Sequence, residues 1–269
     1  MYAVVFHAHQ KLDRVAYRHL RHLVGRPDSW PVVSDILHFE GKRGPDAIKL
    51  KSNPTAGEYP WHFVDPFDTS DKALIKTINE HYNSLVQALK KSNSERVAFE
   101  AAWLAHALVD GLTPAHHYPY EAELKDLRGG RDHKSKTTVM RRITIQGKTH
   151  RESFKRSFKL VGPKGLMMTH TAFEGGAFMI ILPLSLDSAM PSKTDLANFK
   201  ELGLTAFFQQ QAREIGALNL YERFYKFGWT PKLARLVRKE MAPRMAQVVT
   251  LAWYSALVDS GKFVPEIGS

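Results

Sequence analysis

The residues with the clearest chemical potential in this chain lie at positions 106–117, which read HALVDGLTPAHH. His106 and Asp110 are four positions apart, so on a helix their imidazole and carboxylate project from the same face. Pro114 predicts the end of that helix, because the residue before a proline is biased away from helical geometry. His116 then lies just beyond the helix, where it can reach a different cation. The segment therefore predicts ligands for metal ions.

Three further elements carry side chains of the same kind. Each contains at least one histidine and an acid within about one helical turn of it. These residues are His170 and Glu174 in HTAFE, His7, His9 and Asp13 near the start of the chain, and His62 in the loop sequence WHFVDP.

The surroundings of these groups decide between a chance pattern and a shared site. A single His–acid pair four residues apart is common in helices and is usually solvated. Here the neighbours of His106, Asp110 and His170 are largely apolar, including Trp103 and Leu108. Polar and charged groups on such faces are costly to bury unless they are paired or bound to metal. Several of them on different helices predict one polyvalent metal site, and not a structural coincidence.

The chain of 269 residues contains 13 histidines and no cysteine. This composition excludes disulfides, thiolate zinc sites and cysteine nucleophiles. Any metal must be held by histidine, carboxylate or backbone atoms, which is compatible with zinc.

The order of these motifs resembles the zinc-dependent phospholipase C family and, in the same superfamily, the fungal zinc nucleases that cut single-stranded nucleic acid. HALVDGLTPAH matches the central superfamily motif at every spaced position, including the proline. WHFVDP is similar to the histidine-bearing loop of the family. HTAFE is closer to the phospholipase form, because the nucleases usually have Asp where Glu174 stands. The matched elements run from about residue 7 to residue 174.

The resemblance implies a cluster of up to three zinc ions. The first zinc would be held by His62, His106, Asp110 and an upstream aspartate, for which Asp46 is preferred and Asp35 is the rival. The second would be held by His116, His170 and Glu174. The third would be held by His9 and a bridging Asp110. Family members complete this third site with an N-terminal tryptophan, which this chain lacks, so His7 is the substitute if the site is intact.

The chemistry of such a cluster is hydrolysis of a phosphate ester, most simply a diester. Neighbouring zinc ions lower the pKa of a shared water and neutralise charge on phosphoryl oxygens. Asp46 is the expected catalytic residue, since it could orient that water or accept its proton. The expected partner is a phosphodiester, either a phospholipid headgroup or nucleic acid. The first hypothesis is a phospholipase C-like phosphodiesterase, and the alternatives are a nuclease and a non-catalytic metal-binding helical protein. A metal phosphatase built on His-Asp dipeptides ranks lower, because the chain contains no such dipeptide.

Helical periodicity predicts an all-α fold with a single multi-helix domain over residues 1–269, and the resemblance implies that this domain is of the phospholipase C and zinc nuclease type. Thr69 or Ser70 is expected to cap a helix that follows, and Ser92 with Glu95 predicts a capping box. The segment 25–68 holds six prolines and is expected to be mostly loop. The other expected helices lie at about 8–24, 93–112, 166–180, 194–227 with a break near Gly203 or Gly216, and 231–260 with a kink or break at Pro243.

An insert at residues 121–165 carries much of the basic charge. It holds 13 Lys or Arg and five acidic residues, a net +8 out of +11 for the whole chain. Residues 137–146 alternate in hydrophobicity and could form a small β-hairpin. The insert is either a solvated surface excursion or a cationic lid or arm that draws phosphate substrates or an anionic membrane surface. No protein partner is predicted. No secretory signal is visible and the longest apolar run is too short to span a bilayer, which leaves the location of the protein undetermined.

Overall fold

The computed structural model describes residues 2–25, 27–41, 43–46, 62–128, 145 and 147–265, and for residues 2–7 and 120–122 it describes only the helical backbone. The described part is all-α: it contains helices and connecting turns and no strand. This confirms the predicted fold class. One continuous hydrophobic core draws side chains from the first helix to the last, and the extent of the domain over residues 1–269 stays a prediction. Within the described residues, no helix combines the length and apolarity that crossing a membrane would require.

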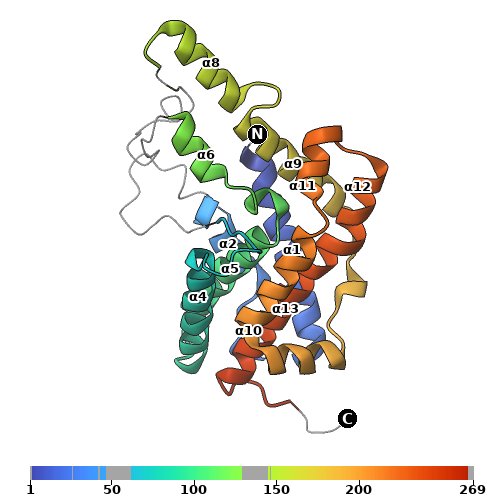
Figure 1. Ribbon diagram of the computed structural model, residues 1–269. Helices are drawn as coiled ribbons and strands as arrows, with labels where there is room; N and C mark the ends of the chain where they lie inside the picture. Colours follow the sequence, from blue (N-terminus) through green and yellow to red (C-terminus); the bar gives the residue numbers. More distant parts are fainter. Residues whose placement is uncertain are drawn as a thin grey trace.

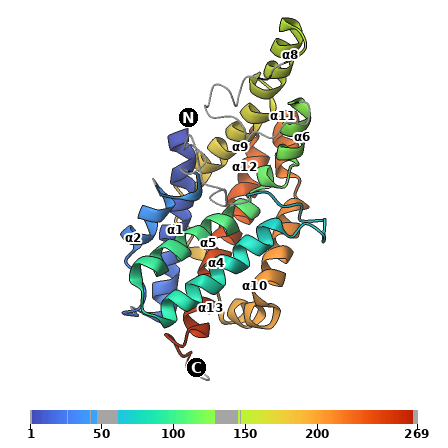
Figure 2. The ribbon, with the colours of Figure 1, turned by 90° about the vertical axis from the view of Figure 1, so that its left-hand side faces the viewer.

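Helix α5 (Ser94–Gly111) is the centre of the molecule. Almost every residue from Val97 to Gly111 is buried, so this helix is apolar on all sides instead of along one stripe. It packs against α4 (Ala73–Lys90), α2 (Val33–Glu40), α1 (Tyr2–Val24) and α13 (Ala242–Asp259), and Figure 2 shows α4 and α5 side by side. A fully enclosed helix is the rigid support that a metal site needs.

The structure corrects the predicted helix caps. Helix α4 begins at Ala73 without a side-chain cap, and Ser70 instead binds the carboxylate of Asp68. Helix α5 is capped by Asn93, whose side chain accepts a hydrogen bond from the backbone N–H of Arg96. Ser92 lies in the left-handed region at φ 53° and cannot serve as the cap. Asparagine is as good a cap as serine, and only the local backbone decides between neighbours.

The prediction that residues 25–68 are mostly loop misses helix α2. This helix places Ile36, Phe39 and Glu40 on its buried face against α1 and α5. Trp30, just before it, packs against Trp253 of α13 with ring centroids 5.5 Å apart. Residues 47–61, including Trp61, lie outside the described part.

The predicted breaks in the C-terminal half are present. Helix α10 (Lys193–Gly216) contains the non-helical Gly203 and ends at Gly216, after which α11 (Leu220–Phe227) begins. The last expected helix is divided into α12 (Pro231–Leu236), a π-helical turn η4 (Val237–Met241) and α13. The wide turn precedes Pro243, whose ring would collide with the carbonyl four residues earlier in a regular helix.

The basic insert contains two described helices, α6 (Tyr120–Leu127) and α8 (His150–Val161). The predicted hairpin at 137–146 lies outside the described residues except for Ile145. Helix α8 projects from one end of the molecule and leads directly into α9 (Leu166–Ile181) (Figure 1). A small separate hydrophobic cluster of Leu124, Ile145, Leu160 and Leu166 attaches this arm to the body.

Candidate metal centre

Asp110 lies in the last turn of α5 and is buried among four histidines from four segments. Its Oδ1 is 3.3 Å from Nε2 of His9 on α1. Its Oδ2 is 3.2 Å from Nε2 of His106 and contacts Nδ1 of His62, while Nδ1 of His116 is 3.6 Å away. The two carboxylate oxygens thus face different histidines, which is the arrangement a carboxylate needs to bridge two cations.

The electrostatics of this cluster are dominated by the interaction of Asp110 with the imidazoles. Burial alone would raise the pKa of Asp110, but the charges of His116, His106 and His62 hold it well below its usual range. Burial alone would lower the pKa of His106, but Asp110, Glu40 and Asp46 outweigh burial and hold it well above its usual range. Asp110 and His106 therefore stabilise each other's charged forms, and a bound cation would compete with protons for these groups.

A second group joins the short helix η1 (Pro114–His116) to α9. Nε2 of His116 is 2.8 Å from Oε1 of Glu174, and Nε2 of His170 is 3.0 Å from the same oxygen. The other ring nitrogen of His116, Nδ1, donates to the backbone carbonyl of His62 at 2.9 Å. Burial alone would raise the pKa of Glu174, but His170 and His116 hold it well below its usual range.

Asp46 and Asp35, the two candidates for the upstream aspartate, are placed differently. Oδ1 of Asp46 is 3.9 Å from Nε2 of His106, and the ligand atoms of Asp46, His62 and His106 lie within 4.8 Å of one another. Asp35 is exposed in the first turn of α2. The geometry therefore favours Asp46.

The rim of the centre differs from its interior in exposure. The side chains of Asp46, His170 and Glu174 are 18%, 14% and 17% exposed. Those of His9, His62, His106, Asp110 and His116 are 6% exposed or less. A substrate would therefore reach the centre from the side of Asp46 and α9.

Glu40, at the end of α2, is a site residue that the sequence analysis missed. Its Oε1 accepts a hydrogen bond from Nδ1 of His106 at 2.8 Å and lies 3.8 Å from Nδ1 of His9. The rings of His9 and His106 stack with centroids 4.1 Å apart, so one carboxylate supports both. The four-residue step from Ile36 to Glu40 is the one signal that could have indicated it, because Ile36 marks the buried face of α2.

Asp13 is buried beside this group, and burial followed by the charge of Glu40 raises its pKa well above the usual range. Among the described residues, neither of its oxygens has a hydrogen-bond partner, nor does Oε2 of Glu40. His7 lies in α1, where only the backbone is described, so its predicted role falls outside the described side chains.

The donor set fits a divalent cation of the zinc type. Four overlapping groups have ligand atoms within 4.8 Å of one another: His9, Glu40 and His106; Asp46, His62 and His106; His62, Asp110 and His116; and His116, His170 and Glu174. Two ligands of one tetrahedral zinc, each at about 2.0–2.1 Å, are separated by about 3.3 Å. Within these groups the His–carboxylate separations run from the short contact of His62 with Asp110 to 3.9 Å between His106 and Asp46, a range that includes this value. Nδ1 of His106 donates to the carboxylate of Glu40 and Nδ1 of His116 donates to the carbonyl of His62, which are the kinds of contact that orient the histidines of most metal sites.

Two neighbours of the ligands have structural roles. Nε2 of His117 donates to the carbonyl of Gly111 at 2.8 Å, and burial lowers the pKa of His117 to about 4. Oδ1 of Asp65 accepts from the backbone N–H of Phe67 at 2.9 Å and so forms a turn before α4. These contacts account for both side chains without a bound metal.

Comparisons with family models, with characterised proteins and with solved structures found no match to this chain.

Proposed function

We propose that the protein is a zinc-dependent phosphodiesterase that hydrolyses its substrate with a metal-activated water. The observation that carries this proposal is the position of Asp110, a single buried carboxylate whose two oxygens face histidines of different groups. A structural zinc site closes on four ligands, whereas this cluster offers overlapping groups with a partly exposed edge. Overlapping groups of this kind suit two or more neighbouring cations, which is the arrangement used for phosphoryl chemistry.

In this proposal His62, His106, Asp110 and Asp46 hold one zinc, and His116, His170 and Glu174 hold the second. His9 and Asp110 belong to the third, where Glu40 stands behind both imidazoles. Bound zinc would supply a water of lowered pKa and charge compensation for the phosphoryl oxygens. Asp46, at the exposed rim, would orient that water or take its proton. Glu40 and the carbonyl of His62 would keep the imidazoles in the tautomer that leaves Nε2 toward the metal.

A phospholipid-type diester is the preferred substrate class, on the ground of the resemblance and of Glu174 in the last ligand pair. Nucleic acid is the main alternative. A metal centre without catalytic activity is the third possibility that the experiment must separate.

The test combines metal analysis with a substrate panel. Protein purified without chelator should contain more than one zinc ion per chain and should cleave a chromogenic phosphodiester. Release of phosphocholine from phosphatidylcholine is then compared with degradation of single-stranded DNA. Fewer than one zinc ion per chain, or zinc without turnover of any substrate, would refute the phosphodiesterase proposal.

Asp110→Asn is the variant that addresses the bridging carboxylate. It should lower kcat/KM by about two orders of magnitude or more, because one substitution weakens more than one metal site. Asp35→Asn is the matched control: it removes one carboxylate from α2 at an exposed position and should behave like the parent. Thermal unfolding of both variants with chelator present separates loss of metal chemistry from loss of fold.

A further inference from the structure

The exposed face of α8 combines aromatic and basic side chains. Arg151, Phe154, Lys155, Phe158 and Lys159 are all exposed, and their spacing of three and four residues places them on one side of the helix. Phe154 and Phe158 are 73% and 55% exposed, and their rings stack with centroids 6.1 Å apart. Glu152, which pairs with Arg156 and is one-third exposed, lies at the edge of this face beside Lys155 and Lys159.

The opposite side of α8 attaches it to the body. Leu160 is buried in the small cluster with Leu124 and Leu166. Arg156 donates to Glu152 at 2.6 Å and to the carbonyl of Leu127 at 3.3 Å, so it links α8 to α6. The exposed phenylalanines are therefore not an unfinished part of the core, because a different face of the helix makes the packing contacts.

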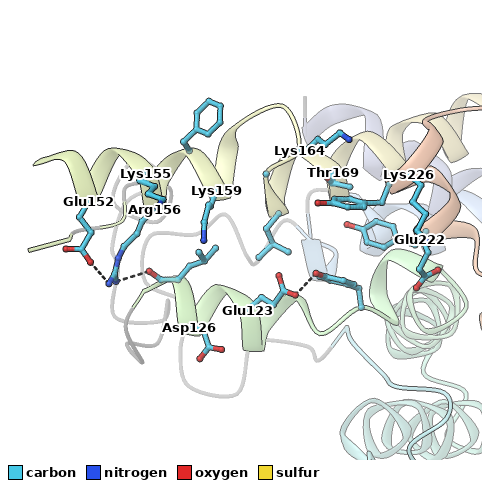
Figure 3. Close-up of a pocket in the computed structure, with 17 residues that line it drawn as sticks. Glu123, Asp126, Glu152, Lys155, Arg156, Lys159, Lys164, Thr169, Glu222 and Lys226 are labelled. Carbon is cyan, nitrogen blue, oxygen red and sulfur yellow. Dashed lines mark hydrogen bonds and ion pairs between the residues drawn. The ribbon is translucent and has the colours of Figure 1, made fainter. Parts of the chain in front are cut away.

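Charge is distributed unevenly around this arm. Between α8, α6 and α11 is a cavity of about 930 Å³ whose walls carry both signs of charge (Figure 3). Lys159, Lys164 and Lys226 line it, and so do Glu123, Asp126 and Glu222. Lys155 and Phe158 of the exposed face border this cavity as well, together with Glu152. The basic residues of that face therefore run along one flank of the phenylalanine strip, and the attraction to an anionic surface is concentrated at that flank.

We propose that the outer face of α8 docks the protein on an anionic phospholipid surface. A helix with Phe on one strip and Lys or Arg beside it suits the boundary between headgroups and acyl chains, where the rings are buried and the charges meet lipid phosphates. Helix α8 has 12 residues and projects from the end of the molecule, so it can reach a flat surface before the body does (Figure 1). Exposed Tyr225 and Phe227 on α11 border the same end.

A membrane fits this face better than single-stranded nucleic acid. A nucleic-acid strand is bound in a basic groove with aromatic platforms for successive bases. Helix α8 offers a convex, projecting surface, and the cavity behind it is mixed in charge. A bilayer requires a convex element with apolar tips and basic flanks, which α8 supplies. The docking does not depend on the proposed catalytic activity.

Flotation of the zinc-loaded protein with vesicles tests this proposal. Vesicles of phosphatidylcholine with 30% phosphatidylglycerol should bind the protein at least tenfold more strongly than phosphatidylcholine alone, and added salt should weaken the binding. The double variant Phe154→Ser/Phe158→Ser should lose at least tenfold in partitioning, and Arg151→Glu/Lys155→Glu should lose the preference for anionic vesicles. Arg156 is left intact because it holds the arm to α6.

The controls make the same changes elsewhere. Phe67→Ser removes a phenylalanine that is 63% exposed on the loop before α4, and Lys90→Glu/Lys200→Glu reverses two exposed charges on α4 and α10. These variants should bind vesicles like the parent. The proposal is overturned if the control variants lose as much vesicle binding as the α8 variants, or if the parent protein does not bind anionic vesicles. It is also overturned by α8-dependent binding of a single-stranded oligonucleotide without vesicle binding, or by a dimer that disappears in the double Phe variant.

Turnover of a soluble chromogenic diester separates this proposal from the previous one. Turnover without vesicle binding would refute only the docking proposal. Vesicle binding without turnover would refute only the phosphodiesterase proposal.

Discussion

At the scale of single residues, Glu40 is the group whose effect is easiest to isolate. It touches two imidazoles on the side away from Asp110 and is itself 1% exposed. Glu40→Gln keeps the shape but weakens the acceptor for Nδ1 of His106, so the ring loses its fixed tautomer. We expect zinc affinity to fall by about 10–100-fold. Competition with a chelator measures this affinity, and the visible spectrum of the cobalt-substituted protein reports the change in ligand geometry.

The matched control is Glu80→Gln, an exposed glutamate on α4 that pairs with Lys76. A purely structural role for Glu40 would lower stability but would leave the zinc affinity of the folded protein and the cobalt spectrum unchanged. That outcome would contradict the positioning role.

His117 gives a pH dependence with a defined sign. Burial lowers its folded-state pKa to about 4, whereas an unfolded histidine has a pKa of about 6.5. The unfolded state therefore binds a proton first as the pH falls, and stability that is present above pH ~6.5 is lost toward pH ~4. Because of this histidine, the free energy of unfolding should be about 2 kcal/mol lower at pH 5 than at pH 7. Chemical denaturation of the chelated parent and of His117→Gln measures the difference, and equal pH slopes would contradict it.

At the scale of elements, α9 contains two adjacent glycines next to Glu174 with opposite surroundings. A Cβ at Gly176 would lie 2.0 Å from Nε1 of Trp229, whereas a Cβ at Gly175 would have nothing within 4 Å. Gly176→Ala should therefore force α9 and Trp229 apart and lower the unfolding free energy by about 1–3 kcal/mol.

Gly175→Ala, one position away in the same helix, should instead raise stability by about 0.5–1 kcal/mol, because alanine loses less backbone entropy. Urea denaturation of both variants tests the packing of α9, and a similar shift in the same direction for both would contradict it. Because α9 carries His170 and Glu174, Gly176→Ala should also weaken zinc binding, and Gly175→Ala should not.

At the scale of the whole molecule, the metal centre joins segments that are far apart in sequence. Its residues come from α1, α2, α5, η1, α9 and the loop around His62. A cation bound to the folded form alone stabilises it by about 2.7 kcal/mol at 100 times its dissociation constant. For a chain of this size that corresponds to about 5–10 °C in the melting temperature. Calorimetry should show that EDTA lowers the melting temperature by this amount. Excess zinc should restore the melting temperature, and magnesium should not. An unchanged melting temperature would contradict a metal centre at this position.

The pairing of candidate ligands within one helix could be predicted from the sequence, because spacing determines which residues share a helical face. His106 with Asp110 and His170 with Glu174 are such pairs, and Pro114 ends the first helix before His116 as expected. The breaks at Gly203 and before Pro243 could also be predicted, since they follow from backbone chemistry that acts within a few residues.

Contacts between distant segments depended on the tertiary structure. Asp46 was already the preferred aspartate in the sequence, but its position 3.9 Å from His106 and the buried position of Glu40 depend on how distant segments pack together, which no local pattern encodes. The cap of α5 was decided by the backbone angles at Ser92 and Asn93, where neighbouring polar residues are chemically equivalent. The net charge of the insert was visible in the sequence. Its arrangement as a phenylalanine strip flanked by basic residues that border a cavity of mixed charge was not, because that arrangement depends on which side of α8 packs against the body.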